Sequence, residues 1–403
     1  MALIQSLMDG LNGGGRSRGS KSGSSETGNR VGYMKPIGQM WVNAGEEDGR
    51  SFKVDKDVVL ARNHFMLKDS SYADMSPVII ERGKTKCFLD GNAHEFHDEN
   101  MTRTIRESYD RLKRTYRGVV VEGTGHCGVG SIIGWSNARC AAKLGVKVVL
   151  IANGGIGSTF DELALNRAVC NEANVEVAGV IVNRVARDKV DQTRVYLEKA
   201  MAHFQWDTPL LGVVPDGEML DSPSAFNLAT LFKAERDAFM DVHGESAHRP
   251  LDKFEVVTSS LERMTEKVYR NMMACAEEGK EYRTAFITHR SRTDIIQGLL
   301  AIASRHGDVA GEAVEGTFRG ALVLTGDGRY DRMSSHLEPF LQESALPVVV
   351  SNLSTAKTVD TISSFTPKLN AKDTRRVSSV IGLYTPHIDT GPLLGEFSTG
   401  EYV

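Results

Sequence analysis

The chain has 403 residues, more than one ordinary domain of roughly 100–200 residues, and this length predicts two domains. Its composition, 41% hydrophobic and 25% charged, is that of a globular protein and excludes extended disorder. Lys and Arg number 48 against 52 Asp and Glu, and apolar runs stay far below the ~20 residues of a membrane helix, so neither nucleic acid nor a membrane is an expected partner.

The cysteines indicate a reducing environment. They are odd in number, scattered, and without the CxxC spacing of zinc sites. A disulfide framework is therefore not expected, and the cytoplasm or an organelle matrix is favoured. The five residues are Cys87, Cys127, Cys140, Cys170 and Cys275.

The N-terminal region combines a helix, a loop and a strand. Residues 2–11 place apolar side chains at helical spacing and predict a helix. Residues 13–27 are rich in Gly and Ser and predict a flexible loop, so residues 1–29 are expected to be a residual helix followed by a disordered Gly/Ser loop. Residues 30–37 predict a short strand closed by Pro36.

An alternating pattern follows. A helical stripe over residues 105–116 precedes a buried strand, and apolar strands then alternate with amphipathic helices as far as the turn at Pro215. Such alternation predicts a parallel sheet covered on both faces. The expected strands are 118–121, 146–152, 177–182 and 209–214, and the expected helices are 130–144, 161–172 and 192–204.

A second domain is expected after a polar linker at residues 241–253. Residues 254–390 repeat the alternation on a smaller scale, and residues 391–403 form a tail. The chain is therefore expected to hold two α/β domains, at 30–240 and 254–390. In the second, the expected strands are 284–288, 320–324 and 347–351, and the expected helices are 261–276, 294–304, 334–343 and 355–365.

The strongest local signal is a glycine-rich loop after the strand 118–121. Gly123, Gly125 and Gly128 form G-x-G-x-x-G, a spacing that lets backbone N–H groups approach a pyrophosphate. A dinucleotide site also needs an acidic residue ~20 positions on, but the next strand ends at Asn-Gly-Gly, which disfavours NAD. Nucleophilic catalysis by Cys127 beside a histidine is a further alternative.

Glu122 places a carboxylate at the tip of this strand. A buried carboxylate is costly unless it is paired or binds a cation, and Mg²⁺ in nucleotide-using enzymes is held by one or two carboxylates with phosphate oxygens. The residue therefore indicates a metal site. The alternative is a surface glutamate beside a glycine loop.

Four segments carry a resemblance to a known family. Residues 31–39 (VGYMKPIGQ), 121–131, 144–158 and 179–184 resemble dethiobiotin synthetase and the N-terminal region of long phosphate acetyltransferases. The resemblance implies a P-loop NTPase-like domain with a parallel sheet, and ATP and Mg²⁺ as cofactors.

The same resemblance assigns residues. It implies that Asp57 and Glu122 bind Mg²⁺, that Lys35 is catalytic and faces the phosphates or substrate, that Asn183 recognises adenine and that Pro215 lines the base. The glycines of the loop would belong to the nucleotide site. Plainer alternatives are a strand-end cap for Asn183 and a solvated strand end for Lys35. In the family the acceptor pocket spans a subunit interface, which implies a homo-oligomer and an unidentified small-molecule acceptor.

One departure from the family is large. The family's phosphate loop, G-x-x-x-x-G-K-[ST], is not found, and the nearest match at residues 14–22 has its lysine one place too far on. The helix over residues 2–11 resembles the one that follows that loop. Either the sequence begins late or this form lacks the loop.

Residues 254–388 resemble the DRTGG domain that follows this ATPase-like domain in long phosphate acetyltransferases, although the literal pentapeptide is absent. Acetyl transfer is not expected. The function implied is ATP-dependent activation of a carboxylate or carbamate, with a ligand-sensing second domain. The alternative is a non-catalytic nucleotide- or metabolite-sensing protein. NAD-dependent redox chemistry is a third hypothesis.

Overall fold

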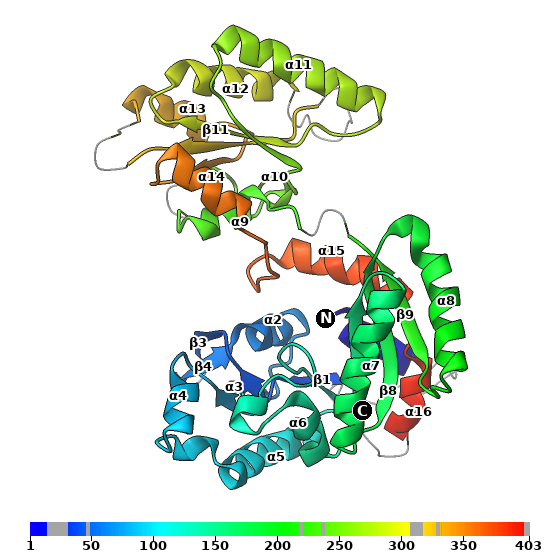
Figure 1. Ribbon diagram of the computed structural model, residues 1–403. Helices are drawn as coiled ribbons and strands as arrows, with labels where there is room; N and C mark the ends of the chain where they lie inside the picture. The colour runs from blue at the N-terminus through cyan, green and yellow to red at the C-terminus, as the bar shows by residue number, and fades with distance from the viewer. Residues whose placement is uncertain are drawn as a thin grey trace, which may run out of the picture. The chain divides into compact units, whose positions relative to one another are not determined.

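A computed structural model of the chain shows two compact units (Figure 1). It describes residues 1–13, 31–45, 49–217, 221–234, 238–306, 317–327, 331 and 333–398. Unit 1 comprises Met1–Asp216 with Leu369–Val403, and unit 2 comprises Gly217–Lys368. Most of the expected Gly/Ser loop lies outside the described residues, and the boundaries expected at residues 240 and 254 stay predictions.

Unit 1 contains parallel strands, as the alternating pattern predicts. Strand β1 (Val31–Met34) pairs in parallel with β6 (Gly118–Val121), and Met34 lies opposite Val121. A second parallel sheet has the order β7–β8–β9, in which Asn153 lies opposite Asn183. Its strands are β7 (Val148–Asn153), β8 (Val177–Val185) and β9 (Leu210–Pro215). The carboxyl ends of paired strands therefore coincide, where ligands bind in open α/β sheets.

Between β1 and β6 the chain forms smaller sheets that the sequence pattern did not indicate. Strands β2 (Ile37–Gly38) and β5 (Val78–Ile79) pair in parallel. Strands β3 (Trp41–Gly45) and β4 (Ser51–Asp55) pair antiparallel. Only one residue of β3 is buried, so its sequence lacks the apolar alternation by which a half-buried strand is found.

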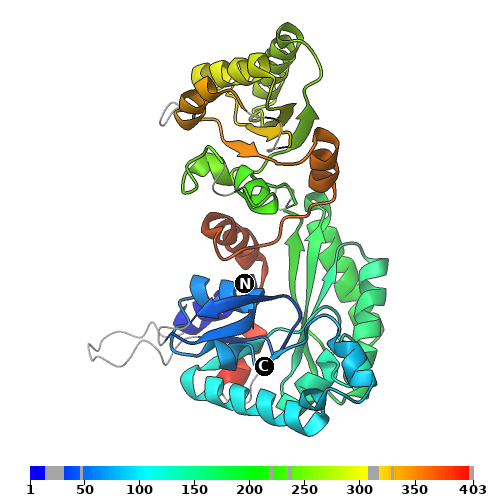
Figure 2. The ribbon, with the colours of Figure 1, turned by 90° about the vertical axis from the view of Figure 1, so that its left-hand side faces the viewer.

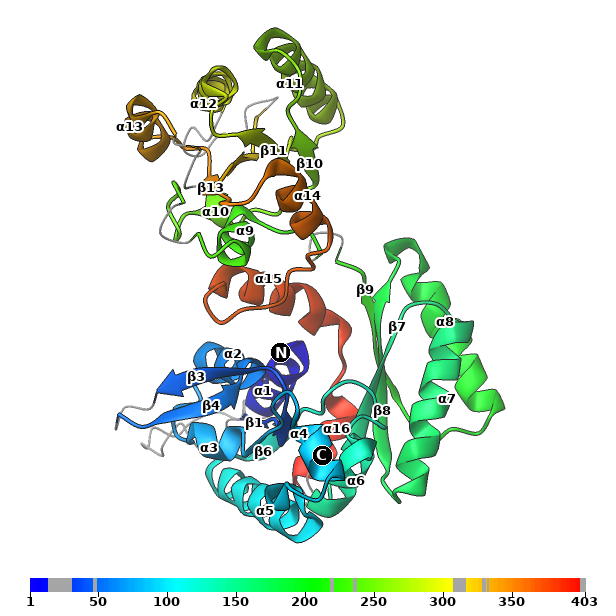
Figure 3. The same cartoon turned by 60° about the vertical axis from the view of Figure 1, so that its left-hand side comes forward.

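Helices cover both faces of the β7–β8–β9 sheet in unit 1 (Figure 3). Helices α7 and α8 lie on one face, and α16 lies on the other. The helices are α1 (Ala2–Gly13), α2 (Lys56–His64), α3 (Tyr72–Met75), α4 (Lys84–Leu89), α5 (Asp98–Thr115), α6 (Asn137–Leu144), α7 (Gly157–Glu172), α8 (Val190–His203), α15 (Thr374–Tyr384) and α16 (Gly391–Ser398). Short 3₁₀ turns are η2 (His94–Phe96), η3 (Ser131–Ile133), η4 (Arg187–Lys189) and η6 (Thr385–His387).

The C-terminal segment of the described chain belongs to unit 1. Residues 369–390, expected within the second domain, lie there together with α16. The Ser6 hydroxyl donates to the Ile388 carbonyl at 3.0 Å, and the Asp389 N–H donates to the Leu211 carbonyl at 2.7 Å. Val377 and Leu393 join the same hydrophobic core as α1. The sequence pattern could not show this return, because it depends on contacts between distant residues.

Replacing Gly212 by alanine should loosen this return. A Cβ atom on Gly212 would lie 2.5 Å from the His387 carbonyl oxygen, so β9 and η6 would have to separate. We expect a loss of about 2 kcal/mol in the free energy of unfolding of unit 1. The three tryptophans, Trp41, Trp135 and Trp206, all lie in unit 1, so fluorescence during urea unfolding reports this unit.

The matched control is Gly382→Ala in α15. Nothing lies within 4 Å of the added Cβ atom, and alanine favours a helix over glycine by about 1 kcal/mol. This variant should therefore be as stable as the parent or more stable. Equal stability of the two variants would contradict the packing of η6 on β9.

Unit 2 is a parallel sheet with helices on both faces (Figure 2). Its strand order is β10–β11–β12–β13, all parallel. One core lies between the sheet and α11, α12 and α13, and another between the sheet and α9 and α14. The strands are β10 (Lys253–Val256), β11 (Thr284–His289), β12 (Ala321–Thr325) and β13 (Val348–Val350). The helices are α9 (Ala225–Leu231), α10 (Glu245–His248), α11 (Leu261–Glu277), α12 (Thr293–His306), α13 (Glu338–Gln342) and α14 (Thr355–Ser363), with the turn η5 (Ser335–Leu337).

Within the described ranges, every helix is too short or too polar to cross a membrane. The α/β fold class predicted from the sequence is confirmed.

Candidate nucleotide and metal site

A lysine and three carboxylates meet at the carboxyl ends of β1 and β6. The Lys35 ammonium donates to Asp57 Oδ2, lies 3.3 Å from Glu122 Oε1 and lies 3.5 Å from Asp55 Oδ1. We call these four residues the Lys35 cluster. The Lys35 side chain is 7% exposed and that of Asp55 is 2% exposed, whereas those of Asp57 and Glu122 are 31% and 44% exposed. The carboxylates of Asp57 and Glu122 therefore reach solvent.

The position of Lys35 follows from β1. All four residues of β1 are buried, and the Lys35 N–H donates to the Met75 carbonyl at 2.8 Å as the chain leaves the strand. Glu122 leaves β6 at the neighbouring position, because its N–H donates to the Met34 carbonyl at 2.8 Å. Two adjacent parallel strands thus deliver a cation and a carboxylate to one edge.

Asp55 and Asp57 come from the junction between β4 and α2. Asp55 is the N-cap of α2, and its side chain accepts from the N–H groups of Asp57 and Gln39, both at 3.1 Å. Aspartate is a favoured residue at this position because its oxygen satisfies an otherwise free N–H group. Asp57 lies in the first turn of α2, with its carboxylate free to face Lys35.

Glu122 is oriented by a buried tyrosine. The Tyr33 hydroxyl donates to Glu122 Oε2 at 2.6 Å, and Tyr33 is 2% exposed. Burial and the Glu122 carboxylate raise the pKa of Tyr33 well above its ordinary value, so the hydroxyl keeps its proton. Glu122 Oε1 remains directed at Lys35.

The charges of the cluster hold Lys35 protonated. Burial alone would lower the pKa of Lys35, but Glu122, Asp57 and Asp55 outweigh burial and raise it above the ordinary value. The same carboxylates act on the Met1 amino group just before α1: burial lowers the pKa of this group, while Glu122 and Asp57 act to raise it. A helix N-terminus and a lysine are both groups that bind phosphate.

The carboxylates fit a metal that needs few protein ligands. Among the described residues, no three His, Cys, Asp or Glu side chains are grouped as a ready metal site. Mg²⁺, however, usually takes one or two carboxylates and completes its shell with water and phosphate oxygens. Asp57 and Glu122 are two carboxylates at this edge, and the Lys35 ammonium donates to both.

The glycine-rich loop is held by side chains of the protein. The Asn137 amide donates to the carbonyls of Thr124 and His126 at 3.0 and 2.8 Å, and its oxygen accepts from the Thr124 N–H at 3.2 Å. The Cys127 N–H donates to Asn166 Oδ1 at 2.9 Å, and the Gly128 N–H donates to His126 Nδ1 at 3.2 Å. The N–H groups of Thr124, Cys127 and Gly128 are therefore already hydrogen-bonded within the protein. The nucleotide-binding roles predicted for Gly123, Gly125 and Gly128 stay predictions.

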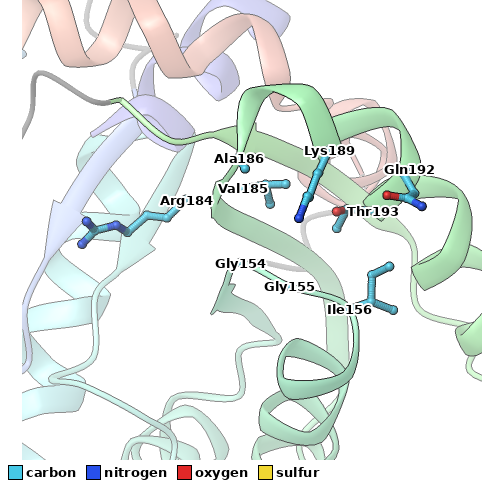
Figure 4. A pocket seen from close by; sticks show the side chains of 9 residues that line it. All are labelled: Gly154, Gly155, Ile156, Arg184, Val185, Ala186, Lys189, Gln192 and Thr193. Atoms are coloured by element: carbon cyan, nitrogen blue, oxygen red, sulfur yellow. The ribbon is translucent and has the colours of Figure 1, made fainter.

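A pocket of about 420 Å³ opens at the carboxyl ends of β7 and β8 (Figure 4). Its lining comes from the turn after β7, the end of β8, η4 and the first turn of α8, and Arg184 extends away from the other lining side chains. The lining residues are Gly154, Gly155, Ile156, Arg184, Val185, Ala186, Lys189, Gln192 and Thr193.

Asn183 and Pro215 lie beside this pocket on adjacent strands. The Gly154 N–H donates to the Asn183 carbonyl at 2.7 Å, and Pro215 at the end of β9 lies opposite Val185. Asn183 Oδ1 is buried without a hydrogen-bond partner within the described chain. An unsatisfied buried acceptor costs about 1–3 kcal/mol, so it is a group that a ligand donor would stabilise.

The structure brings together the residues predicted from the sequence in two groups. Lys35, Asp57 and Glu122 meet at the β1–β6 edge, and Asn183 and Pro215 lie at the ends of β8 and β9. Sequence reasoning missed Asp55 and Tyr33. Asp55 could have been found as an N-cap before a helix, whereas nothing local marks Tyr33 as the partner of a residue 89 positions away.

The α/β fold is that of a P-loop NTPase-like domain. Residues 22–224, just over half of the chain, match the AAA domain family, and the chain belongs to this family.

Known proteins resemble different lengths of the chain. A phosphate acetyltransferase of Nitratidesulfovibrio vulgaris is 22% identical over 371 residues, which are 90% of this chain and 47% of that protein. A cobyric acid synthase of Pelodictyon phaeoclathratiforme is 30% identical over 174 residues, 39% of this chain and 34% of that protein. A cobyrinate a,c-diamide synthase of Streptococcus sanguinis is 35% identical over 89 residues, 22% and 19% of the two chains. The chain spans about half the length of the phosphate acetyltransferases it matches.

Proposed function

We propose that unit 1 binds ATP with Mg²⁺ at the Lys35 cluster and activates a carboxylate or carbamate by phosphorylation. The observation that carries the proposal is the meeting of the Lys35 ammonium with the Asp57 and Glu122 carboxylates, which come from separate segments. Membership in the AAA domain family supports nucleotide binding.

The cluster would work by exchanging partners. On binding, the Lys35 ammonium would turn from the carboxylates to a phosphate oxygen, and Asp57 and Glu122 would be left to hold Mg²⁺. When bound, Mg²⁺ supplies positive charge against the phosphate oxygens. Because its pKa is raised, Lys35 stays charged at neutral pH and can stabilise negative charge on a transferring phosphoryl group.

The pocket beside Asn183 is the proposed place of the base. Its volume of about 420 Å³ falls within the ~300–1,000 Å³ of ordinary small-molecule sites. The unpaired Asn183 Oδ1 could accept a hydrogen bond from an exocyclic amino group, such as that of adenine.

The acceptor is proposed from chemistry shared with the relatives. One of them is named as a synthase of cobyrinate a,c-diamide, a product with amides formed on a carboxylic acid. A carboxylate must be activated before it becomes an amide, and phosphorylation by ATP is such an activation. We propose a small-molecule acceptor, bound in a homo-oligomer within a reducing compartment.

A non-catalytic sensing role is the second candidate. Similarity to the phosphate acetyltransferase extends over 90% of the chain, and so through both units. This supports a DRTGG-like, ligand-sensing role for unit 2 whose state is passed to a partner. Release of phosphate that depends on a carboxylic acceptor would favour the enzyme, and tight nucleotide binding without turnover would favour the sensor.

The test is calorimetric titration of ATP into the Glu122→Gln variant, with and without Mg²⁺. Glutamine keeps the size of the side chain but removes the charge that a metal requires. We expect affinity to fall at least about tenfold with Mg²⁺, equivalent to ~1.4 kcal/mol, and to change little without it.

The control is Glu81→Gln, which removes a carboxylate paired with Lys53 outside the Lys35 cluster. It should titrate like the parent. Equal weakening of binding by Glu122→Gln in both conditions would remove the metal role. No ATP binding by the parent would contradict the proposed function.

A further inference from the structure

Two buried cysteines touch beside the glycine-rich loop. Cys127 lies in that loop and Cys170 lies in α7, and their sulfur atoms are 3.6 Å apart. Cys127 is 8% exposed and Cys170 is not exposed. The two thiols are thus in contact although they lie 43 residues apart in the sequence. The spacing of the cysteines gave no indication of such a pair.

Neighbouring side chains hold the pair in place. Asn166, one turn before Cys170 in α7, accepts from the Cys127 N–H at 2.9 Å, and its own amide donates to the Glu162 carbonyl at 2.9 Å. Asn137 fixes the loop just before Cys127 through the His126 carbonyl. The contact between the sulfur atoms is therefore part of the fold of unit 1.

The two thiols also change each other's acidity. A hydrogen bond from Cys127 lowers the pKa of Cys170, and the same contact raises the pKa of Cys127. Cys140 is the contrast, because burial alone raises its pKa to about 12. The thiolate is the reactive form of cysteine, and the lowered pKa of Cys170 favours that form.

We propose that Cys127 and Cys170 are an oxidation site that forms a reversible disulfide with peroxide and fastens the glycine-rich loop to α7. The oxidant is hydrogen peroxide, a small molecule that would reach the pair through Cys127, since this residue is 8% exposed and Cys170 is not exposed. This inference does not rest on nucleotide binding by the Lys35 cluster.

The chemistry balances in two steps. Peroxide first converts one thiol to a sulfenic acid, in which an S–O bond forms, the O–O bond breaks and water leaves. The second thiol then attacks that sulfur, the S–S bond forms, the S–O bond breaks and a second water leaves. Two thiols lose two protons and two electrons, and one peroxide is reduced to two waters.

The loop can supply the movement that the bond requires. A disulfide is ~2.05 Å long, so the sulfur atoms must approach by about 1.5 Å. Cys127 lies between Gly125 and Gly128, whose backbones are less restricted than those of other residues. Helix α7 can then stay in place while the loop moves toward it.

The experiment is peroxide treatment of the folded chain, followed by alkylation of free thiols, trypsin digestion without reductant and mass spectrometry. Cleavage places Cys127 in peptide 118–139 and Cys170 in peptide 168–184, each with no other cysteine. We expect these peptides joined in most molecules, with the loss of two hydrogen atoms, and separated again after dithiothreitol.

Matched variants decide the result. Cys140→Ser, at a cysteine that is also buried, should form the same joined peptides, and Cys127→Ser should form none. Oxidation of the exposed Cys87 shows that peroxide has acted. If Cys87 is oxidised while the two peptides keep alkylated thiols, or carry sulfinic acid that dithiothreitol does not reverse, the proposal is overturned.

Discussion

Replacing Gly130 by alanine is expected to lower the free energy of unfolding of unit 1 by about 4 kcal/mol. Gly130 has φ of +97°, and an added Cβ atom would lie 2.0 Å from the Trp135 carbonyl oxygen. The left-handed backbone contributes ~1–2 kcal/mol of this cost, and displacement of the backbone contributes the rest. Urea unfolding followed by tryptophan fluorescence measures it.

The expected loss of stability is large because the turn at Gly130 is hydrogen-bonded to the residues that follow it and contacts a buried tryptophan. The Gly130 carbonyl accepts from the N–H groups of Ile133 and Trp135 at 3.1 and 3.0 Å, and Trp135 is 2% exposed. Moving the carbonyl of Trp135 therefore disturbs η3 and a large buried side chain together.

Gly145→Ala is the matched control. Gly145 is also left-handed, with φ of +69°, but nothing lies within 4 Å of an added Cβ atom. The backbone cost alone should be about 1 kcal/mol. If the two variants lose the same stability, the close approach of Gly130 to Trp135 does not exist in solution.

Replacing Lys35 by methionine should cost about 3 kcal/mol in the same measurement. Methionine keeps the length of the side chain but leaves the carboxylates of Asp55, Asp57 and Glu122 together without their cation. Removing one partner of a buried ion pair costs ~3–5 kcal/mol, and we take the lower end because Asp57 and Glu122 are partly exposed.

The pH dependence of this stabilisation follows from the direction in which folding shifts the pKa of Lys35. The pKa of Lys35 is higher in the folded than in the unfolded chain, so its stabilisation is fully present below the unfolded value of about 10.5. It is lost only as the pH rises through the folded value, which is higher still. At neutral pH the difference between Lys35→Met and the parent should therefore show no dependence on the titration of Lys35.

Two further variants sharpen the test. Lys84→Met breaks an exposed pair with Glu95 and should leave the unfolding curve nearly unchanged. Adding Glu122→Gln to Lys35→Met removes one of the unpaired charges and should restore part of the lost stability. A Lys35→Met variant as stable as the parent would show that the cluster does not form.

The central strands were the part of the fold most open to prediction from the sequence. The strand expected at 118–121 has those bounds, and the one expected at 209–214 is observed as β9, Leu210–Pro215. Continuous apolar runs between turn residues identify buried parallel strands. The helix expected at 130–144 was too long, because Gly130 and Gly134 adopt left-handed backbone and divide it into η3 and α6.

The part of the site that could be predicted from the sequence is the set of residues that directly follow predicted strands. Lys35 and Glu122 follow two strands that pair in parallel, so their meeting follows from the topology. The burial of Asp55 and the contact of Cys127 with Cys170 depend on side-chain packing between distant segments, which periodicity does not encode. The metal- and nucleotide-binding roles assigned to the site residues stay predictions, and the ATP titrations can test them.

The return of the C-terminal segment has a consequence for the order of folding during synthesis. Unit 2 is continuous in sequence, so it can complete its core while the chain is still growing. The hydrophobic core of unit 1 includes Ile4 near the start of the chain and Val377 and Leu393 near its end. This core is therefore incomplete until the last of these residues has been synthesised. We therefore expect ribosome-bound chains that end before residue 369 to be protected from protease in unit 2 and cleaved in unit 1.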